Sequence, residues 1–489
     1  MVITTRVTII RDSGVPLYRQ LRQALEHEIA TGALDPELPL PSSRELAREL
    51  GLSRNTVNTA YAELEAEGFV EAEARRGLFV NREMLEGAAR SAREPVSAPV
   101  DWSRHVTERR DADMPEIAKV KDWHRYPYPF VGGQIDVASF PRLAWSRALR
   151  EALKPPHLHF SLRDGIDEDD PELLEMLCRH VLPGRGIEVD PSQVLVTLGS
   201  QQGLDLLAHT LVRPGSMVAV EDPGYPDTRH IFTRAGAELR YVPVDGSGAL
   251  PPPDLAGVSL LALTPSHHSP TNVTLSVARR RALMAMAEEH DSLILEDDYD
   301  SEFRYQGSPS PALKAMPASE RVIYLGTFSK FLAPGLRLGY LVAAPELVAE
   351  LRNQRRYRVR HAAGHTQRAM ALLIASGQYH RTVRRRRTQL SRSWATLRRA
   401  LDTHLDWARE TPPPGGTSIW VTAPDGFDCV RLAESALERG VVVERGDIYF
   451  ADPDANRNHL RLGFAAIPED RIEPGVAILG ELAAAQADS

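Results

Sequence analysis

The chain has 489 residues, of which 43% are hydrophobic and 25% charged, a composition typical of a globular protein with about three domain-sized units. Its two cysteines, Cys178 and Cys429, are too few for a disulfide framework, and no apolar run is long enough for a signal peptide or a membrane span, so we expect a cytoplasmic protein. The net charge of −8, taken alone, argues against nucleic acid as a partner, so the distribution of charge along the chain matters more.

Residues 14–81 are expected to form a small helical unit. Leucine or isoleucine recurs every four residues within 16–31, which predicts an amphipathic helix there. A capping-box spacing at Ser42 and Glu45 predicts the start of a second helix, and a tight turn separates that helix from a third one over 54–67. Helix, short turn and helix is the pattern of a helix-turn-helix.

The start of the third helix presents polar side chains that suit the edges of DNA bases. They are Arg54, Asn55, Thr56 and Asn58. In such motifs this end of the helix enters the major groove, where arginine can pair with guanine and asparagine with adenine. Arg75 and Arg76 lie between two apolar runs and predict a β-hairpin wing with a basic tip. The alternative is a protein-interaction module, because residues 1–81 carry more acidic than basic side chains.

The segment LARELGLSRNTV at 46–57, with PSSR before it and Gly68-Phe69 after it, resembles the winged helix of GntR-type bacterial regulators. The resemblance covers about the first eighty residues. It implies double-stranded DNA as the partner. The side chains that it places at DNA are Arg44, Arg54 and Thr56, with Arg75, Arg76 and Gly77 at the wing.

The rest of the chain is predicted to be a linker followed by one two-part domain. Residues 82–125 are polar and contain prolines, so we interpret them as the linker. From 126 to 370, short apolar runs alternate with helical stretches, which is the pattern of an α/β sheet. Buried strands are expected at 194–197, 217–220, 260–263, 293–295 and 322–325, with a helix at 277–290. Within the domain, 126–489, the large part spans about 190–370 and a smaller α+β part spans 371–489.

A lysine with phosphate-binding neighbours follows the last of these strands. The segment is Gly326-Thr327-Phe328-Ser329-Lys330, and Arg337 comes soon after it. The hydroxyls of Thr327 and Ser329 and the guanidinium of Arg337 can bind a phosphate. Lys330 can then form an imine with an aldehyde cofactor. The alternative is a lysine that provides only surface charge.

An acidic segment, Glu296-Asp297-Asp298-Tyr299, follows another expected strand. A carboxylate at a strand end can hold a pyridinium N–H, which makes Asp297 a candidate partner for a cofactor ring. Tyr299 lies on the same side of an extended chain and can reach a ring hydroxyl. The alternatives for such a strand end are a metal site or a helix cap, although no metal is expected.

Two further strand ends carry polar or aromatic groups. Ser200 and Gln201 follow a glycine turn at the start of an expected helix, where backbone N–H groups favour a phosphate. Tyr225, within Asp222-Pro223-Gly224-Tyr225-Pro226, can stack on a pyridine face. A tyrosine of the protein core is the alternative there.

Together these segments resemble the fold-type I aminotransferases, and closer still the MocR/GabR-type transcription regulators, in which a GntR-like winged helix is fused to an aminotransferase-like domain. The resemblance implies an N-terminal winged helix-turn-helix, an α/β domain of the aminotransferase fold and pyridoxal 5′-phosphate (PLP) as cofactor. By position, the PLP site would comprise Lys330, Asp297, Tyr299, Tyr225, Ser200, Gln201, Thr327, Ser329 and Arg337. Arg461 matches the arginine that binds the carboxylate of an amino-acid ligand. A head-to-tail homodimer on repeated DNA half-sites is also implied.

Two segments depart from the aminotransferase pattern. The turn that is Asn-Pro-Thr-Gly in aminotransferases is Ser269-Pro270-Thr271-Asn272 here. A Tyr-Gly-Asp-type segment that reaches the partner subunit's phosphate is Asp164-Gly165-Ile166-Asp167. The MocR/GabR-type regulators also tend to lack the asparagine of the Asn-Pro-Thr-Gly turn. Its replacement by Ser269 here therefore favours sensing over turnover.

Three functions are compatible with these patterns. The first is a PLP-dependent transcription regulator that senses an amine or amino acid by forming an external aldimine in place of Lys330. The second is a functional aminotransferase that also binds DNA, and even the regulator is expected to be capable of a half-transamination. The third is a PLP-binding scaffold whose N-terminal unit binds protein.

Fourteen arginines and no lysine or acidic residue lie between Arg352 and Arg399. Arg384 to Arg387 are consecutive and therefore cannot share one face of a helix, so some of them must point away from the core. The nearby members of this arginine cluster are Arg381, Arg392, Arg398 and Arg399. We expect the cluster to contact DNA between half-sites or the acidic domain of the partner subunit, and a solvated helix face is the alternative.

Overall fold

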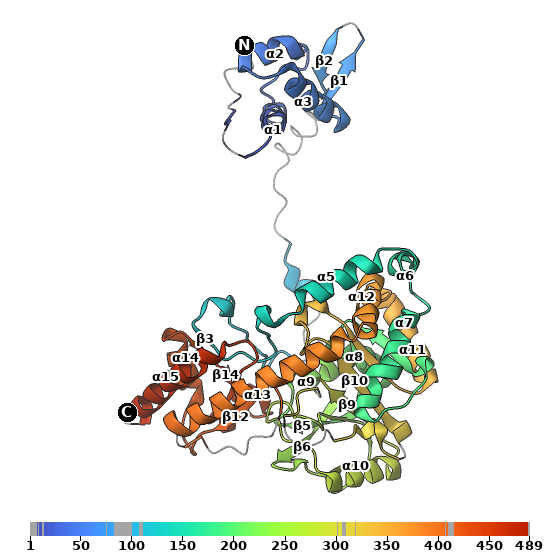
Figure 1. Ribbon diagram of the computed structural model, residues 1–489, viewed down its shortest axis with the longest axis vertical. Coiled ribbons are helices and arrows are strands. Elements are labelled where there is room, and N and C mark those ends of the chain that lie inside the picture. The colour runs from blue at the N-terminus through green and yellow to red at the C-terminus, as the bar shows by residue number, and fades with distance from the viewer. Residues whose placement is uncertain are drawn as a thin grey trace. The chain divides into compact units, whose positions relative to one another are not determined.

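The chain divides into two compact units, Met1–Thr107 and Glu108–Ser489, both drawn in Figure 1. The computed structural model describes residues 7, 9–11, 14–74, 76–82, 100–106, 111–300, 302–305, 310–317, 319–405, 407–408 and 415–487. Within these residues, every helix is too short or too polar to cross a membrane.

The first unit is a helix-turn-helix with a β-hairpin wing, as predicted. Its elements are α1 (Leu17–Ala30), α2 (Ser43–Leu50), α3 (Arg54–Ala66), β1 (Val70–Glu73) and β2 (Gly77–Val80). The Ser42 side chain accepts a hydrogen bond from the Glu45 amide, and the Ser53 side chain accepts one from the Thr56 amide, so both helices begin at hydroxyl caps. Gly51 adopts the left-handed conformation (φ +62°) that ends α2 and allows the tight turn.

An apolar core holds these elements together. The residues that recur along α1, Leu21, Leu25 and Ile29, are completely buried, and they pack with residues of α2, α3 and the wing. From α3, Val57 and Leu64 enter this core. The opposite side of α3 is therefore left for solvent, which follows from the 3.6-residue period of the helix.

The second unit contains a mostly parallel sheet, as predicted. Among the described residues the strand order is β4-β11-β10-β9-β8-β5-β6-β7, with β7 and β11 antiparallel to their neighbours. The strands are β4 (Val194–Thr197), β5 (Met217–Asp222), β6 (Glu238–Asp245), β7 (Gly248–Ala249), β8 (Val258–Leu263), β9 (Leu293–Asp298), β10 (Val322–Thr327) and β11 (Gly339–Val342). All five predicted strands are present, and four of them extend beyond the predicted ends.

Helices cover both faces of this sheet. On one face lie α8 (Ser200–Leu211), α9 (Pro226–Arg234) and α11 (Pro345–Val359), and on the other lies α10 (Val277–Glu289). Successive residues of a strand alternate between the two faces: Leu260 packs with α8 and Leu261 with α10. Double burial explains why these strands appear in the sequence as continuous apolar runs.

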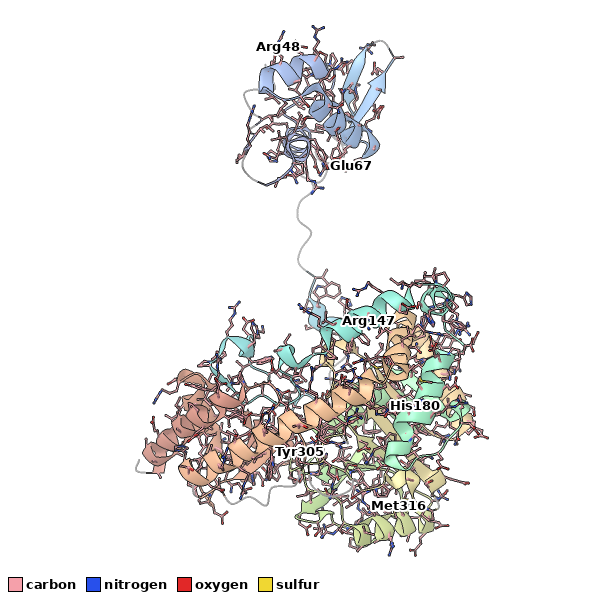
Figure 2. The ribbon with its side chains drawn as sticks, viewed as in Figure 1. Arg48, Glu67, Arg147, His180, Tyr305 and Met316 are labelled. Atoms are coloured by element: carbon pink, nitrogen blue, oxygen red, sulfur yellow. The ribbon has the colours of Figure 1, made fainter. Side chains whose placement is uncertain are left out.

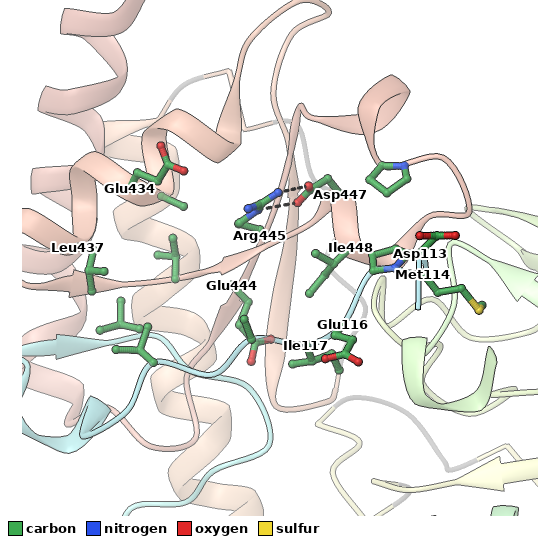
Figure 3. A pocket seen from close by; sticks show the side chains of 17 residues that line it. Asp113, Met114, Glu116, Ile117, Glu434, Leu437, Glu444, Arg445, Asp447 and Ile448 are labelled. Carbon is green, nitrogen blue, oxygen red and sulfur yellow. Dashed lines mark hydrogen bonds and ion pairs between the residues drawn. The ribbon is translucent and has the colours of Figure 1, made fainter. Parts of the chain in front are cut away.

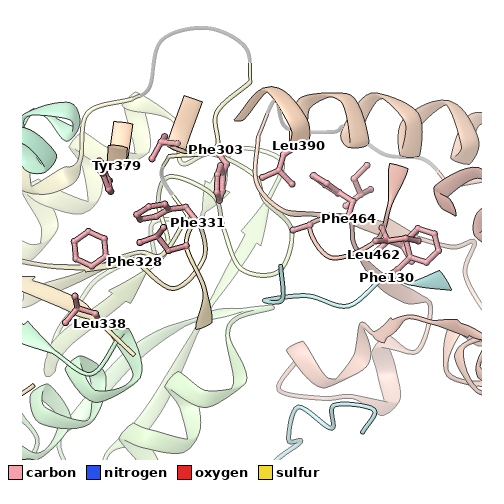
Figure 4. Packing of buried hydrophobic residues seen from close by; sticks show 14 of the residues in the cluster. Phe130, Phe303, Phe328, Phe331, Leu338, Tyr379, Leu390, Leu462 and Phe464 are labelled. Carbon is pink, nitrogen blue, oxygen red and sulfur yellow. The ribbon is translucent and has the colours of Figure 1, made fainter. Parts of the chain in front are cut away.

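The remaining elements continue from the sheet to a smaller part. They are β3 (Tyr128–Pro129), α5 (Arg142–Ala152), α6 (Leu158–Leu162), α7 (Pro171–Met176), α12 (Gly364–Ala375), α13 (Gln378–His404), β12 (Ser418–Thr422), α14 (Cys429–Glu438), β13 (Val441–Val442), β14 (Glu444–Arg445), β15 (His459–Gly463) and α15 (Glu469–Ala487). The order β12-β15-β14 forms the smaller sheet. One apolar core joins the two parts, with Phe328 and Phe331 at one end and Phe464 and Phe130 at the other (Figure 4).

Residues 111–125, which the sequence assigned to the linker, pack instead on the second unit. Asp111 is fully buried, and its carboxylate binds His230 Nδ1 and Arg234 Nε of α9, each at 2.7 Å. Trp123 packs beside Val442 of the smaller part. The predicted linker boundary at 125 is therefore wrong, because a polar segment can be fixed by buried ion pairs that composition does not reveal.

Candidate functional site

The predicted cofactor residues meet at one edge of the large sheet. Ser200 and Gln201 follow β4, Tyr225 follows β5, Asp297 and Tyr299 lie at the end of β9, Thr327, Ser329 and Lys330 lie at the end of β10, and Arg337 precedes the antiparallel β11. Because β11 runs opposite to β10, its beginning lies where the parallel strands end. Ligands of open α/β sheets bind at this carboxyl edge.

Lys330 is positioned by a buried aromatic anchor. Phe328 and Phe331 flank it in the sequence, and both rings are buried in the shared core. The Lys330 ammonium nitrogen lies 5.5 Å from the centre of the Tyr299 ring. Burial, assisted by the positive charge of Arg461, lowers the pKa of Lys330 to about 8. A larger fraction of the amine is therefore neutral and nucleophilic near neutral pH than for an exposed lysine.

Several polar atoms around Lys330 are buried without a hydrogen-bond partner among the described residues. They include Asp297 Oδ1, Tyr299 Oη and Ser329 Oγ, together with Asp300 Oδ2. Burial, together with the neighbouring charge of Asp298, raises the pKa of Asp297 to about 7. Asp298 also has one oxygen without a partner, Oδ1, but its Oδ2 accepts hydrogen bonds from Arg185 Nε and Tyr324 Oη, both at 2.8 Å. Unsatisfied buried groups require an explanation, and a polar ligand that supplies a donor to Asp297 provides one.

The phosphate-binding candidates lie between α8 and the Arg337 turn. Arg337 donates from Nη2 to the carbonyl oxygen of Leu198 at 2.7 Å, which holds the guanidinium beside the first turn of α8. A side chain at Gly199 (φ +85°) would meet this guanidinium at 3.3 Å, so glycine is required there. Thr327 Oγ1 accepts a hydrogen bond from the Ser329 amide at 3.2 Å. Backbone N–H groups at a helix start and an arginine together suit a phosphate.

Gln201 and Tyr225 are held by a residue that sequence reasoning missed. The Gln201 side-chain amide donates to Asp227 Oδ2 at 2.7 Å, and the Tyr225 hydroxyl donates to the same oxygen at 2.9 Å. One of the two side-chain N–H donors of Gln201 is therefore engaged, which leaves the other donor and the backbone N–H for a phosphate. Tyr225 and Asp297 line one cavity, which is compatible with the predicted ring-stacking position of Tyr225.

Arg461 is buried and already paired. Its Nη1 lies 3.0 Å from Glu444 Oε2 and 3.1 Å from Tyr449 Oη, and its Nε donates to Ser418 Oγ at 3.0 Å. Burial lowers the pKa of Arg461, but the neighbouring Tyr449 and the carboxylate of Glu444 outweigh burial and keep it above its ordinary value. Sequence reasoning missed Glu444, because its place opposite Arg461 follows only from the pairing of β14 with β15.

The substituted turn connects the two parts of the domain. Asn272 stands where aminotransferases have glycine and adopts φ +60°, a region that asparagine tolerates better than most residues. Its Nδ2 donates to the backbone oxygen and to Oγ of Ser418, the residue that also binds Arg461. The Ser269 amide donates to Thr264 Oγ1 at 3.1 Å.

The predicted DNA-facing residues of the first unit lie on its surface. Arg44, Arg54, Asn55, Asn58, Arg76 and Gly77 are exposed, and Arg48 of α2 also projects from this unit (Figure 2). Asn58, Arg76 and Gly77 line a 640 Å³ hollow between α3 and the wing. Thr56 is half-buried, and its hydroxyl lies 2.8 Å from Ser53 Oγ within the helix cap. Arg75 lies outside the described residues.

The arginine cluster is divided between buried side chains that bind within the second unit and exposed ones. Arg386 is 1% exposed and donates to Ser139, so the expectation that it contacts DNA or a partner is wrong. Arg355 is fully buried and binds Asp169 at 2.7 Å. Arg387 donates to the Glu302 carbonyl oxygen at 2.8 Å. Buried acidic groups elsewhere in the chain therefore account for part of the positive charge, whereas Arg384 is exposed as expected.

Comparisons with known proteins agree with both units. The family model of aminotransferase class I and II matches residues 144–479, and that of the bacterial regulatory proteins of the gntR family matches 17–80. The HTH-type transcriptional regulator TauR of Rhodobacter capsulatus is 40% identical over 466 residues, which cover 94% of this chain and 95% of that protein. The probable rhizopine catabolism regulatory protein MocR of Rhizobium meliloti is 35% identical over 77% of this chain and 75% of its own.

This chain belongs to the MocR family of transcription regulators. A gntR-type helix-turn-helix is fused in it to an aminotransferase class I/II domain, as the sequence resemblance implied. The crystal structure of Pyrococcus horikoshii kynurenine aminotransferase superposes on this MocR-type regulator with a TM-score of 0.71 and 26% identity, over 80% of this chain and 99% of that one. The aminotransferase fold implies PLP binding, and the residues gathered around Lys330 fit that cofactor.

Proposed function

We propose that this MocR-type regulator binds PLP at Lys330 and uses the site to sense a small amine or amino acid. The observation that carries the proposal is the set of unpartnered buried groups, Asp297, Tyr299 and Ser329, around a lysine of lowered pKa. When bound, PLP supplies an aldehyde carbon that can exchange the lysine amine for the amine of a small molecule. The kynurenine aminotransferase with the same fold was solved in complex with PMP.

Each residue has a distinct role in the proposed site. Asp297 would accept the ring N–H, and Tyr299 would bind the ring oxygen. Thr327, Ser329, Arg337 and the backbone N–H groups of Ser200 and Gln201 would hold the phosphate, and Tyr225 would cover the ring. An incoming amine would release the Lys330 side chain, and Arg461 would bind a carboxylate of the effector. The exchange changes which charged groups in the site are paired. A ligand that makes different contacts in two conformations can shift the equilibrium between them, as allostery requires.

Sensing is favoured over turnover by the architecture. A DNA-binding unit is fused to the domain, and the turn at 269–272 lacks the asparagine that contacts the ring oxygen in aminotransferases. The second candidate is a working aminotransferase, which is favoured by the presence of Lys330, Asp297, Tyr299 and Arg461 at one site. Repeated turnover of an amino acid with a 2-oxo acid acceptor would support the enzyme, and a single half-reaction would support the sensor.

A homodimer that presents two winged helices is part of the proposal. Exposed apolar side chains gather on α6 and at the end of α11, including Leu158, Leu162, Tyr357 and Val359. The Arg360–Asp164 ion pair holds these two helix ends together. Exposed apolar surface of this kind is typical of protein interfaces. Two winged helices on such a dimer would bind repeated half-sites of double-stranded DNA, with α3 in the major groove.

The proposal is tested by measuring the binding of the full chain to the DNA upstream of its own gene. Fluorescence anisotropy is recorded for the PLP-loaded protein with and without L-alanine, a probe that carries both an amine and a carboxylate. We expect wild type to change its DNA affinity or footprint on addition of amine, and Lys330→Ala to show no change. Equal responses of both proteins would contradict sensing at Lys330.

A further inference from the structure

A cavity of about 480 Å³ lies beside the proposed effector site, within the second unit. Residues 113–118 form one wall, and α14 with β14 forms the other (Figure 3). Met114, Ile117, Leu437 and Ile448 contribute apolar lining. Glu444 is part of the same lining, and Figure 3 shows it between β14 and the segment that carries Glu116 and Ile117.

Glu444 also holds Arg461. Its Oε2 lies 3.0 Å from Arg461 Nη1 and accepts a hydrogen bond from Tyr449 Oη at 3.2 Å, while its Oε1 accepts one from the Gly132 amide at 2.9 Å. The two paired side chains are only 8% (arginine) and 12% (glutamate) exposed. Glu444 and Arg461 are directly opposite each other in the ladder of β14 and β15, so the strand register itself sets the pair.

The pair lies next to the reactive lysine. A side chain at Gly132 would collide with Arg461 and Glu444, each at 2.6 Å, and one at Gly133 would lie 3.0 Å from Lys330 Nζ. The two glycines therefore separate the pair from the lysine by the width of a backbone turn. A ligand whose amine reaches Lys330 and whose tail bears a carboxylate would encounter an arginine that is already neutralised.

Two consequences follow for the selectivity of the site. A carboxylate that binds Arg461 at Nη1 must displace the carboxylate of Glu444, and one that binds elsewhere on the guanidinium meets a cation whose charge Glu444 already neutralises. An amine with an uncharged tail leaves the pair intact. A displaced carboxylate that remains buried and unpaired is strongly unfavourable. The cavity is an alternative position for this carboxylate, because Glu444 is among the residues that line it.

We propose that Glu444 is a specificity-determining residue that competes, as an internal counterion of Arg461, with the carboxylate of acidic effectors. The site thereby discriminates against amino acids relative to amines of the same size, and an acidic effector that takes Nη1 of Arg461 does so by moving Glu444 toward the cavity. This proposal rests on the proposed effector site around Lys330, which it deepens.

Glu444→Gln is the central variant, because it removes the charge while it retains a side chain of the same shape. Glu434→Gln is the matched control, because Glu434 lines the same cavity from α14 and is exposed. Its charge helps to raise the pKa of Arg445. Glu444→Asp keeps the charge but withdraws it from Arg461. It supplies an intermediate case that can be measured even if the glutamine variant does not fold.

The first experiment needs no cofactor. Thermal unfolding of the cofactor-free proteins is followed with increasing propionate, a carboxylate without an amine. We expect propionate to stabilise Glu444→Gln at roughly ten-fold lower concentration than wild type, because a charge-assisted hydrogen bond of this kind contributes about one order of magnitude or more in affinity. Glu434→Gln should behave like wild type and Glu444→Asp should fall between. Identical propionate curves for all four proteins would overturn the proposal.

The second experiment uses the PLP-loaded proteins. L-alanine and ethylamine are titrated separately, and the shift of the visible absorption band gives an apparent dissociation constant for each. The preference for alanine over ethylamine should rise about ten-fold in Glu444→Gln and stay unchanged in Glu434→Gln. An unchanged preference in Glu444→Gln would overturn the proposal. A wild-type protein that takes up no PLP would refute the proposed function instead, and the propionate experiment would still judge Glu444.

Discussion

Replacing Asp297 by asparagine should make the cofactor-free protein more stable and its cofactor binding weaker. The Asp297 carboxylate is buried, one of its oxygens lacks a partner among the described residues, and its pKa is raised from 3.8 to about 7. Because the folded protein binds this proton more tightly than the unfolded chain, stability falls as the pH rises from about 4 to about 7 and stays low above that. The pKa difference corresponds to roughly 4 kcal/mol at pH 8.

Asparagine removes the charge but leaves an amide that also lacks a partner, which offsets roughly 2 kcal/mol of that gain. We therefore expect urea unfolding of cofactor-free Asp297→Asn to show about 2 kcal/mol more stability than wild type at pH 8 and roughly 1 to 2 kcal/mol less near pH 4, where the wild-type carboxyl is protonated and only the cost of the amide remains. The affinity for PLP should fall by roughly 10-fold to 100-fold, because the variant loses a charge-assisted hydrogen bond to the ring nitrogen.

Asp298→Asn is the matched control, with the opposite expected sign. Asp298 binds Arg185 and Tyr324, and although burial opposes it, the charge of Arg185 lowers its pKa. Removing this partner from buried Arg185 should destabilise the protein by about 3 kcal/mol. The reasoning is refuted if Asp297→Asn is no more stable than wild type at pH 8, or if both variants shift stability in the same direction.

Three further predictions concern other parts of the chain. The initial rate of PLP uptake by the cofactor-free protein, followed by absorbance, should rise about ten-fold per pH unit up to about pH 8 and then level off. The reason is that only the neutral amine of Lys330 reacts with the aldehyde. A rate that levels off only near pH 10.5 would contradict this prediction. Arg355→Gln should lower the unfolding free energy by about 3 kcal/mol, because Arg355 pairs with buried Asp169, whereas exposed Arg384→Gln should change it by less than about 0.5 kcal/mol. Arg54→Ala should weaken operator binding more than binding to random DNA in anisotropy titrations; an equal loss on both would assign Arg54 to phosphate contacts.

Local signals predicted much of the fold. Ser42 and Ser53 cap α2 and α3 through hydrogen bonds within three residues, so the sequence alone carries the information. The strands of the large sheet are buried on both faces and therefore appear as apolar runs. The residues at Lys330, Asp297 and Tyr225 could be brought together because they follow strand ends, and parallel strands end at a common edge.

The missed features all depend on contacts between distant segments. Glu444 reaches Arg461 only through the register of β14 and β15. Asp111 is fixed by two residues of α9 that lie more than a hundred positions away, so its segment has the composition of a linker without being one. Arg386 is one of four consecutive arginines, and no sequence pattern distinguishes it from exposed Arg384. Long-range polar pairing is poorly encoded in local periodicity.

The most direct test of the account is to locate the cofactor chemically. The purified protein is mixed with PLP, reduced with borohydride, digested, and analysed by mass spectrometry for pyridoxyl-modified lysines. The chain makes this decisive, because its only other lysines are Lys119, Lys121, Lys154 and Lys314. We expect stoichiometric modification of Lys330 and none in a Lys330→Ala variant. Modification spread over the other lysines, or equal modification of the variant, would contradict it.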